Sequence, residues 1–206
     1  MTFKYYNILF LIFLEFAFDD NCLLKYEVSN DIIYLEPGNK RLTIKSKIIN
    51  RSTKNVVLYN FQGEIIMPPF EEKELCGEKV AANRMIFVYD EEMNQIFPGN
   101  FVLIPDSLDY SPMPKERVID IIDISRRKFI ASSIILEANQ SIANLINIDL
   151  NDYDIRKGIY YVQLAYASGK YVSNFVTDID VEDNVKNNRE VFNGCVRANR
   201  VKVVVK

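Results

Sequence analysis

The residues that could do chemistry are serines, cysteines and clustered carboxylates, because the 206-residue chain contains no histidine. Without imidazole, neither a Ser–His nor a Cys–His nucleophile pair can form, and the histidine-containing zinc sites are excluded too. Ser125 and Lys128 fit the Ser-x-x-Lys nucleophile motif of penicillin-recognising enzymes. The companion Lys-Thr-Gly is absent, so we interpret this short match as chance and predict no catalytic residue.

Carboxylates are clustered in two groups that contain the oxygen ligands Ca²⁺ prefers. They are Asp178, Asp180, Glu182 and Asp183, and Asp149, Asp152 and Asp154. The first group alternates along a predicted strand and is interpreted as a charged strand edge, and the second as a corner. Calcium is the alternative for both, and we predict no metal and no cofactor.

Two pairs of adjacent carboxylates, Glu71–Glu72 and Glu91–Glu92, could in principle do acid–base work. Both pairs fall in predicted turns or loops, where neighbouring carboxylates are usually solvated. We therefore assign them no catalytic role.

Three cysteines are present, and Cys76 and Cys195 lie in the body of the chain. In an exported protein these two could form a disulfide. Two unpaired cysteines are the equal alternative, because the sequence does not show that they are close. Cys22 lies at the end of the N-terminal apolar segment.

The first 22 residues read as a signal-like hydrophobic segment. Lys4 precedes an apolar stretch over residues 5–18, which Asp19 and Asp20 end. This stretch is shorter than the roughly 20 residues that cross a bilayer and suits a secretory signal. We predict export to the periplasm, the cell surface or the medium. A retained membrane anchor and a hydrophobic first element of the fold are the alternatives.

Short segments with alternating apolar and polar residues predict an all-β antiparallel sandwich of the immunoglobulin-like type for residues 23–206. The predicted strands cover residues 41–50, 55–61, 129–138, 141–150, 158–166, 171–176 and 201–205, with a hairpin over 84–97. Residues 117–124 fit either a strand or one short helix. No long amphipathic helix is predicted, and residues 182–190 read as a polar loop.

Gly158 and Tyr160 predict a tyrosine corner. Gly158 stands where the chain turns into a strand, and Tyr160 begins the inward face that continues with Val162 and Leu164. In a tyrosine corner the hydroxyl bonds back to the backbone of the preceding corner.

On these residues the chain resembles bacterial exported immunoglobulin-like domains, and more loosely the intracellular proteinase inhibitor family. Residues 155–162 are similar to a Leu-x-x-Gly-x-Tyr-x-Val corner, and residues 194–201 are similar to a Gly-x-x-x-Ser-Asn-x-Val approach to the last strand. The resemblance covers roughly residues 25–61 and 128–206. Its motifs are structural and imply a sandwich fold rather than one activity.

Residues 62–127 depart from that pattern and are predicted to be a loop-rich insertion, since six of the seven prolines lie between Pro68 and Pro114. Its candidate partner-binding residues are Met67, Phe70, Phe97, Tyr110 and Met113. The alternative is that these residues cover an open end of the sandwich.

The expected function is a non-enzymatic exported or envelope module that binds an unidentified protein. A net charge of −3 argues against nucleic acid, and a membrane would be contacted only through the N-terminal segment. The alternative function is a protease inhibitor that presents Met67–Phe70 or Pro98–Gly99 to an enzyme cleft. Asn50 and Asn139 begin glycosylation acceptor triplets.

Overall fold

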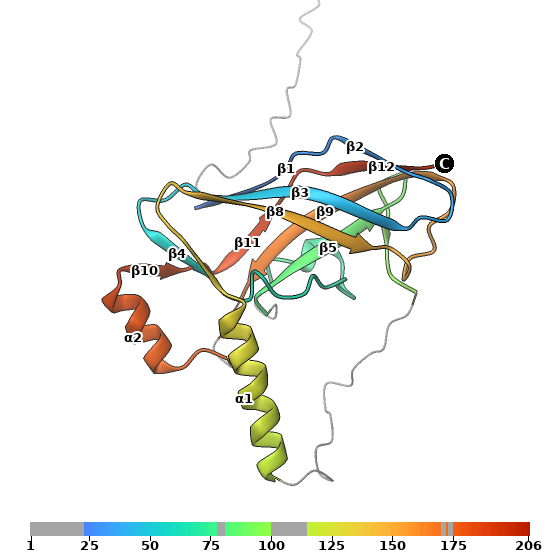
Figure 1. The fold of residues 1–206 in the computed structure, drawn as a ribbon. Helices are drawn as coiled ribbons and strands as arrows, with labels where there is room; N and C mark the ends of the chain where they lie inside the picture. Colours follow the sequence, from blue (N-terminus) through green and yellow to red (C-terminus); the bar gives the residue numbers. More distant parts are fainter. Residues whose placement is uncertain (1–22, 78–80, 100–114, 170–171, 173–174) are drawn as a thin grey trace, which may run out of the picture.

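The computed structural model describes residues 23–77, 81–99, 115–169, 172 and 175–206. In this part of the chain most regular structure is β-strand, and antiparallel sheets pack against each other as a sandwich (Figure 1). The predicted all-β sandwich is therefore confirmed. The segment before Leu23, with its signal-like stretch and Cys22, lies outside the described residues.

The first sheet is antiparallel and has the order β1-β3-β8. Its strands are β1 (Leu24–Val28), β3 (Arg41–Asn50) and β8 (Ser141–Asp149). Along β3 every second side chain is buried, including Leu42, Ile44 and Ile48. Because the side-chain period of a strand is two, this alternation fixes which face meets the core.

The second sheet has the order β2-β12-β9-β5-β6, with β11 beside the end of β9. Its strands are β2 (Ile32–Leu35), β5 (Asn83–Tyr89), β6 (Gln95–Ile96), β9 (Gly158–Ser168), β11 (Gly194–Arg197) and β12 (Val201–Val205). The predicted hairpin is confirmed, because β5 pairs with β6 around a turn in which the Asp90 N–H donates to the Asn94 carbonyl at 3.0 Å.

The main core lies between these two sheets. Val162, Leu164 and Tyr166 of β9 face the first sheet, as predicted, and the Tyr166 hydroxyl donates to the Tyr59 carbonyl at 2.9 Å. A second apolar layer covers the opposite face of β5 and β9, where Leu75 packs with Phe87. The segment 62–77 supplies this cover and contains the short 3₁₀ helix η1 (Glu72–Glu74).

The predicted insertion is not loop throughout. Residues 62–127 contribute β5, which pairs with the central strand β9, and much of α1 (Lys115–Ala131). The absence of a long helix was therefore a wrong prediction, since α1 has 17 residues. The predicted strand 129–138 is also wrong in its first half, because Phe129 belongs to α1 and only β7 (Ile134–Leu136) is extended.

A third, small sheet has the order β10-β4-β7 and joins both helices to the sandwich. Its remaining strands are β4 (Asn55–Leu58) and β10 (Arg189–Val191). The C-terminal end of α1 packs here, because Phe129 stacks between Tyr59 and Phe175 at ring distances of 5.8 and 4.6 Å. The two helices project from this side of the sandwich (Figure 1).

The acidic residues from Asp178 to Asp183 lie on helix α2 (Asp178–Lys186), which corrects the predicted strand and the first part of the predicted loop 182–190. Thr177 and Asp180 form a capping box at its N-terminus, and Arg126 pairs with Asp180 at 2.7 Å. Burial opposes ionisation of Asp180, but hydrogen bonds from Thr177 and Arg126 outweigh it and lower its pKa.

Of the predicted return strand 171–176, the described residues 172, 175 and 176 are not extended strand.

Candidate functional site

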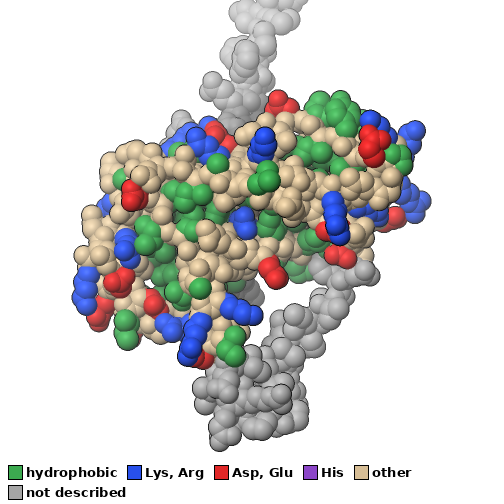
Figure 2. All heavy atoms as spheres, in the orientation of Figure 1, with side chains coloured by type: hydrophobic (Ala, Val, Ile, Leu, Met, Phe, Trp, Pro, Cys, Tyr) green, Lys and Arg blue, Asp and Glu red, His purple; other side chains and the backbone are tan. Residues whose placement is uncertain are grey.

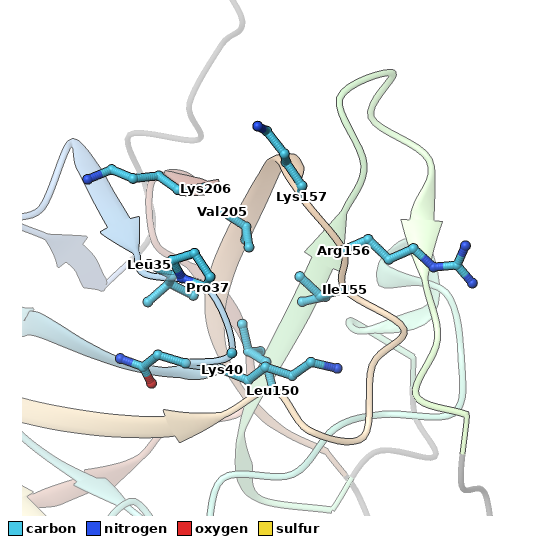
Figure 3. A pocket seen from close by; sticks show the side chains of 11 residues that line it. Leu35, Pro37, Lys40, Leu150, Ile155, Arg156, Lys157, Val205 and Lys206 are labelled. Atoms are coloured by element: carbon cyan, nitrogen blue, oxygen red, sulfur yellow. The ribbon is translucent and has the colours of Figure 1, made fainter.

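A pocket of about 260 Å³ lies at one end of the sandwich and is the candidate site (Figure 3). Three segments that are far apart in the sequence form it: the end of β2 with the turn after it, the corner between β8 and β9, and the end of β12. Such pockets at the ends of sheets are ordinary locations for ligands and partner side chains.

The floor of the pocket is apolar. Leu35, Leu150 and Ile155 line it and are buried, and Val205 adds a half-buried side chain. Backbone hydrogen bonds hold these walls, because the Leu150 N–H donates to the Lys40 carbonyl at 2.9 Å. The floor is therefore preformed by the core.

The rim of the pocket is basic. Lys40, Arg156, Lys157 and Lys206 surround the floor (Figure 3). Arg156 pairs with Asp154 at 3.0 Å and Lys206 with Glu36 at 2.9 Å, while Lys157 makes no ion pair with another described residue.

Two of the rim cations have raised pKa values. The hydrogen bond to Glu36 raises the pKa of Lys206, and the hydrogen bond to Asp154 raises that of Arg156. An apolar floor beneath retained cations suits an apolar group that carries a carboxylate.

The predicted corner residues, Gly158 and Tyr160, follow Arg156 and Lys157, which line the pocket. The Tyr160 hydroxyl accepts a hydrogen bond from the Arg156 N–H at 3.0 Å, four residues upstream, which is the bond that a tyrosine corner requires. Gly158 has a φ of +157°, which L side chains rarely adopt. Together, Gly158 and Tyr160 fix the path of the chain past the pocket.

Replacing Tyr160 by phenylalanine is expected to lower the free energy of unfolding by about 0.5–1.5 kcal/mol, the usual net value of one hydrogen bond. Urea unfolding measures this change, and Tyr34→Phe on β2 is the matched control, because Tyr34 is 60% exposed. Equal unfolding midpoints for the two variants would show that the corner bond contributes nothing.

A disulfide joins Cys76 to Cys195, with their Cα atoms 5.2 Å apart. It ties the segment that follows η1 to β11, and it resolves the alternatives that the sequence left open. The Cys195 side chain also packs against the apolar layer under segment 62–77. The disulfide thus helps to hold segment 62–77 on the sheet. We call the contacts that hold this segment the clamp.

Glu72 completes that clamp, which corrects its interpretation as a solvated turn residue. Its carboxylate pairs with Arg197 at 2.6 Å and Arg200 at 3.2 Å and accepts a hydrogen bond from the Tyr89 hydroxyl. Burial, and then the hydrogen bond to Glu72, raise the pKa of Tyr89. Two cations pair with this carboxylate. Such an arrangement holds a segment in place and does not suit a general base.

Of the predicted partner-binding residues, Met67, Phe70 and Phe97 lie in the described part of the chain. Met67 packs against the main core, and Phe70 lies edge-on against Phe87 at a ring distance of 6.4 Å. Phe97 is 40% exposed. Tyr110 and Met113 lie outside the described residues.

The two loops considered for an inhibitor are partly packed, and Pro69 and Gly99 are exposed. In Met67–Phe70, Pro68 is buried, and the neighbouring Ile66 N–H bonds to the Arg84 carbonyl at 3.0 Å. In Pro98–Gly99, Pro98 is buried and the Gly99 N–H donates to Asp152 at 2.7 Å.

The other sequence candidates are placed as follows. No group of three or more metal-ligating side chains occurs among the described residues. Asp149 pairs with Arg41 at 3.4 Å, and Ser125 and Lys128 are exposed on α1. Among the glycosylation candidates, Asn50 is completely buried and Asn139 is exposed.

Sequence reasoning missed the pocket, because its floor and rim come from three segments that are far apart in the sequence and follow no motif. The chain matches no known family model, and no curated protein is similar to it. None of the described helices is long and apolar enough to span a membrane.

Proposed function

We propose that this chain is a non-enzymatic, exported β-sandwich module that binds another protein through the pocket between β2, β12 and the β8–β9 corner. The observation that carries the proposal is the apolar floor of Leu35, Leu150 and Ile155 beneath a basic rim. The matching partner feature is an apolar side chain next to a carboxylate, such as an acidic loop or a chain terminus. The floor buries the side chain, and the rim attracts the charge.

The disulfide supports export. Cys76 and Cys195 pair in the structure, and disulfides persist mainly in oxidising compartments. The N-terminal sequence agrees with this compartment, because Lys4 precedes an apolar stretch of signal-peptide length. The expected location is the cell envelope or the medium.

The strand order supports the resemblance to immunoglobulin-like domains. In those domains one sheet contains the third, sixth and seventh strands of the fold, and the other contains the first, second and fifth. Here β5, β9 and β12 stand for the third, sixth and seventh strands, with β9 between the other two. In the other sheet β1, β3 and β8 stand for the first, second and fifth strands, with β3 between the other two. The bond between Tyr160 and Arg156 supports the same relationship. Such domains commonly act by binding, with loops at the ends of the sandwich forming the contact.

Nuclear magnetic resonance with N-acetyl-leucine as the probe tests the proposed site, because this molecule joins an apolar side chain to one carboxylate. Titration into the isotope-labelled protein is expected to shift the methyl signals of Leu150, Ile155 and Val205. The neutral N-acetyl-leucine methylamide is expected to bind more weakly, because it lacks the charge that the rim attracts.

Charge reversal at the rim supplies the matched comparison. Lys157→Glu is expected to weaken binding of N-acetyl-leucine at least about fivefold, since a repulsive charge replaces an attractive one. Lys47→Glu, an exposed lysine on the outer face of β3, is expected to leave binding unchanged. Unshifted methyl signals at millimolar probe, or equal effects of the two variants, would refute the pocket as the binding site.

A further inference from the structure

The longest strand edge that lacks a partner in the described part of the chain belongs to β8. Its nine residues, Ser141–Asp149, pair with β3 on one side only. The opposite edge of the same sheet is β1, and the side chain of Asn199 blocks it. Asn199 accepts from the Val28 N–H at 2.8 Å and donates to the Val28 carbonyl at 3.0 Å, as a neighbouring strand would.

The register shows which backbone groups β8 leaves free. The Asn50 N–H donates to the Gln140 carbonyl and the Leu150 N–H to the Lys40 carbonyl, so the even-numbered residues of β8 bond to β3. The backbone N–H and C=O groups of the odd-numbered residues therefore point away from the sheet. These residues are Ser141, Ala143, Leu145, Asn147 and Asp149, and their side chains are exposed.

The free edge lacks the features by which proteins prevent edge-to-edge pairing. It contains no lysine, proline or bulge, and its one charged residue, Asp149, is paired with Arg41. Leu145 stands at its centre and is 62% exposed. Figure 2 shows this face of the molecule, where cationic side chains are spread over the sheet with hydrophobic side chains between them.

We propose that β8 pairs antiparallel with β8 of a second copy of this chain, so that two three-stranded sheets join into one. In the register of greatest overlap Leu145 lies opposite Leu145 of the second copy, and Ala143 lies opposite Asn147. Asp149 then lies opposite Ser141, so no like charges meet. All the outward backbone groups between Ser141 and Asp149 gain partners in this register.

One unexplained polar atom fits the same register. The Nδ2 of Asn144 is buried on the inner side of β8 and has no hydrogen-bond acceptor among the described residues. Across the two-fold axis the Asn144 residues of the two copies become diagonal neighbours. Each Nδ2 can then donate to the Oδ1 of the other, which removes the cost of a buried donor without an acceptor.

Charge variants at the centre of the edge test the pairing by sedimentation velocity of the full chain. The 23.9 kDa chain is expected to sediment as a dimer, and Leu145→Lys and Leu145→Glu are each expected to raise the dimer dissociation constant at least about tenfold. An equimolar mixture of the two variants is expected to recover the dimer, because opposite charges then meet. Ile135→Lys, a similar exposed change on β7, is the control that keeps the dimer.

A cysteine at position 145, which lies on the two-fold axis of the proposed dimer, tests the register itself. The cysteine variants are made in a Cys22→Ser background. Opposed residues of a hydrogen-bonded antiparallel pair have Cα atoms about 5.5 Å apart, within the range of a disulfide. Mild oxidation of Leu145→Cys is therefore expected to give a covalent dimer, whereas Ala143→Cys is not. A monomeric wild-type chain, or no recovery in the mixture of charge variants, would overturn the proposal, and efficient linkage of Ala143→Cys would overturn the register.

Discussion

Replacing both Cys76 and Cys195 by serine is expected to lower the free energy of unfolding by about 2–5 kcal/mol. The disulfide closes a loop with a sequence separation of 119 residues, so its removal frees a large part of the unfolded chain. It also releases one attachment of segment 62–77, whose side chains cover β5 and β9. Guanidinium unfolding of the double variant beside the oxidised wild-type chain measures the loss.

Cys22→Ser is the matched control for that experiment, because it removes a thiol and leaves the disulfide intact. We expect its unfolding midpoint to equal that of the wild-type chain. Limited proteolysis is expected to cut the double variant first within residues 62–77. If the double variant and the control unfold at the same guanidinium concentration, the disulfide is not part of the clamp.

Asn50→Ala is expected to cost about 2–4 kcal/mol of stability, because it leaves three buried or part-buried carbonyl groups without this donor. The Nδ2 of Asn50 lies 2.7 Å from the Lys54 carbonyl and 3.0 Å from those of Leu136 and Glu137, and its Oδ1 accepts from Ser52. One side chain thus joins the end of β3 to the turn before β4 and to the end of β7.

Thermal and urea unfolding measure this loss. Asn50→Asp is expected to be at least as destabilising, because a carboxylate has no N–H to donate. Asn151→Ala, an exposed asparagine in the β8–β9 corner, is the control and is expected to change stability by less than about 0.5 kcal/mol. A stable Asn50→Ala protein would contradict the assigned network, and it would reopen the acceptor triplet at Asn50 as a glycosylation site.

The strands with strict alternation were predictable from the sequence. In β3, β8 and β12 the pattern of period two predicts the strand and groups its apolar residues on one face, and Ile44, Ile146 and Val203 are buried in the structure. The hairpin of β5 and β6 was also predictable, since polar turn residues separate two apolar runs.

Helix α1 was not predictable by the same reasoning, because its described apolar residues are divided between buried and exposed positions. Phe129 is buried, but Ile122 and Ile124 are 58% and 53% exposed, so the apolar side chains described from Ile122 onward do not form one buried stripe with helical spacing. Helix α2 did carry a usable signal. Thr177 followed three residues later by Asp180 is a capping-box pattern, which predicts a helix start, whereas the alternating charges favour a strand.

The candidate site depended on the fold. The corner at Gly158 and Tyr160 was visible as a local motif, but no local pattern places Lys40 and Lys206 beside it. The clamp is similar, because Glu72 meets Arg197 and Arg200 only after β11 pairs with β9. Long-range sheet pairing therefore determines which side chains meet in the pocket and in the clamp.

The intact mass of the chain purified from its native host, before and after reduction, tests export most directly. We predict a chain that lacks the first ~20 residues and gains two hydrogens on reduction, as Cys76 and Cys195 open. An uncleaved chain whose mass does not change on reduction would contradict the account, because it would place the protein where neither signal processing nor disulfide formation occurs.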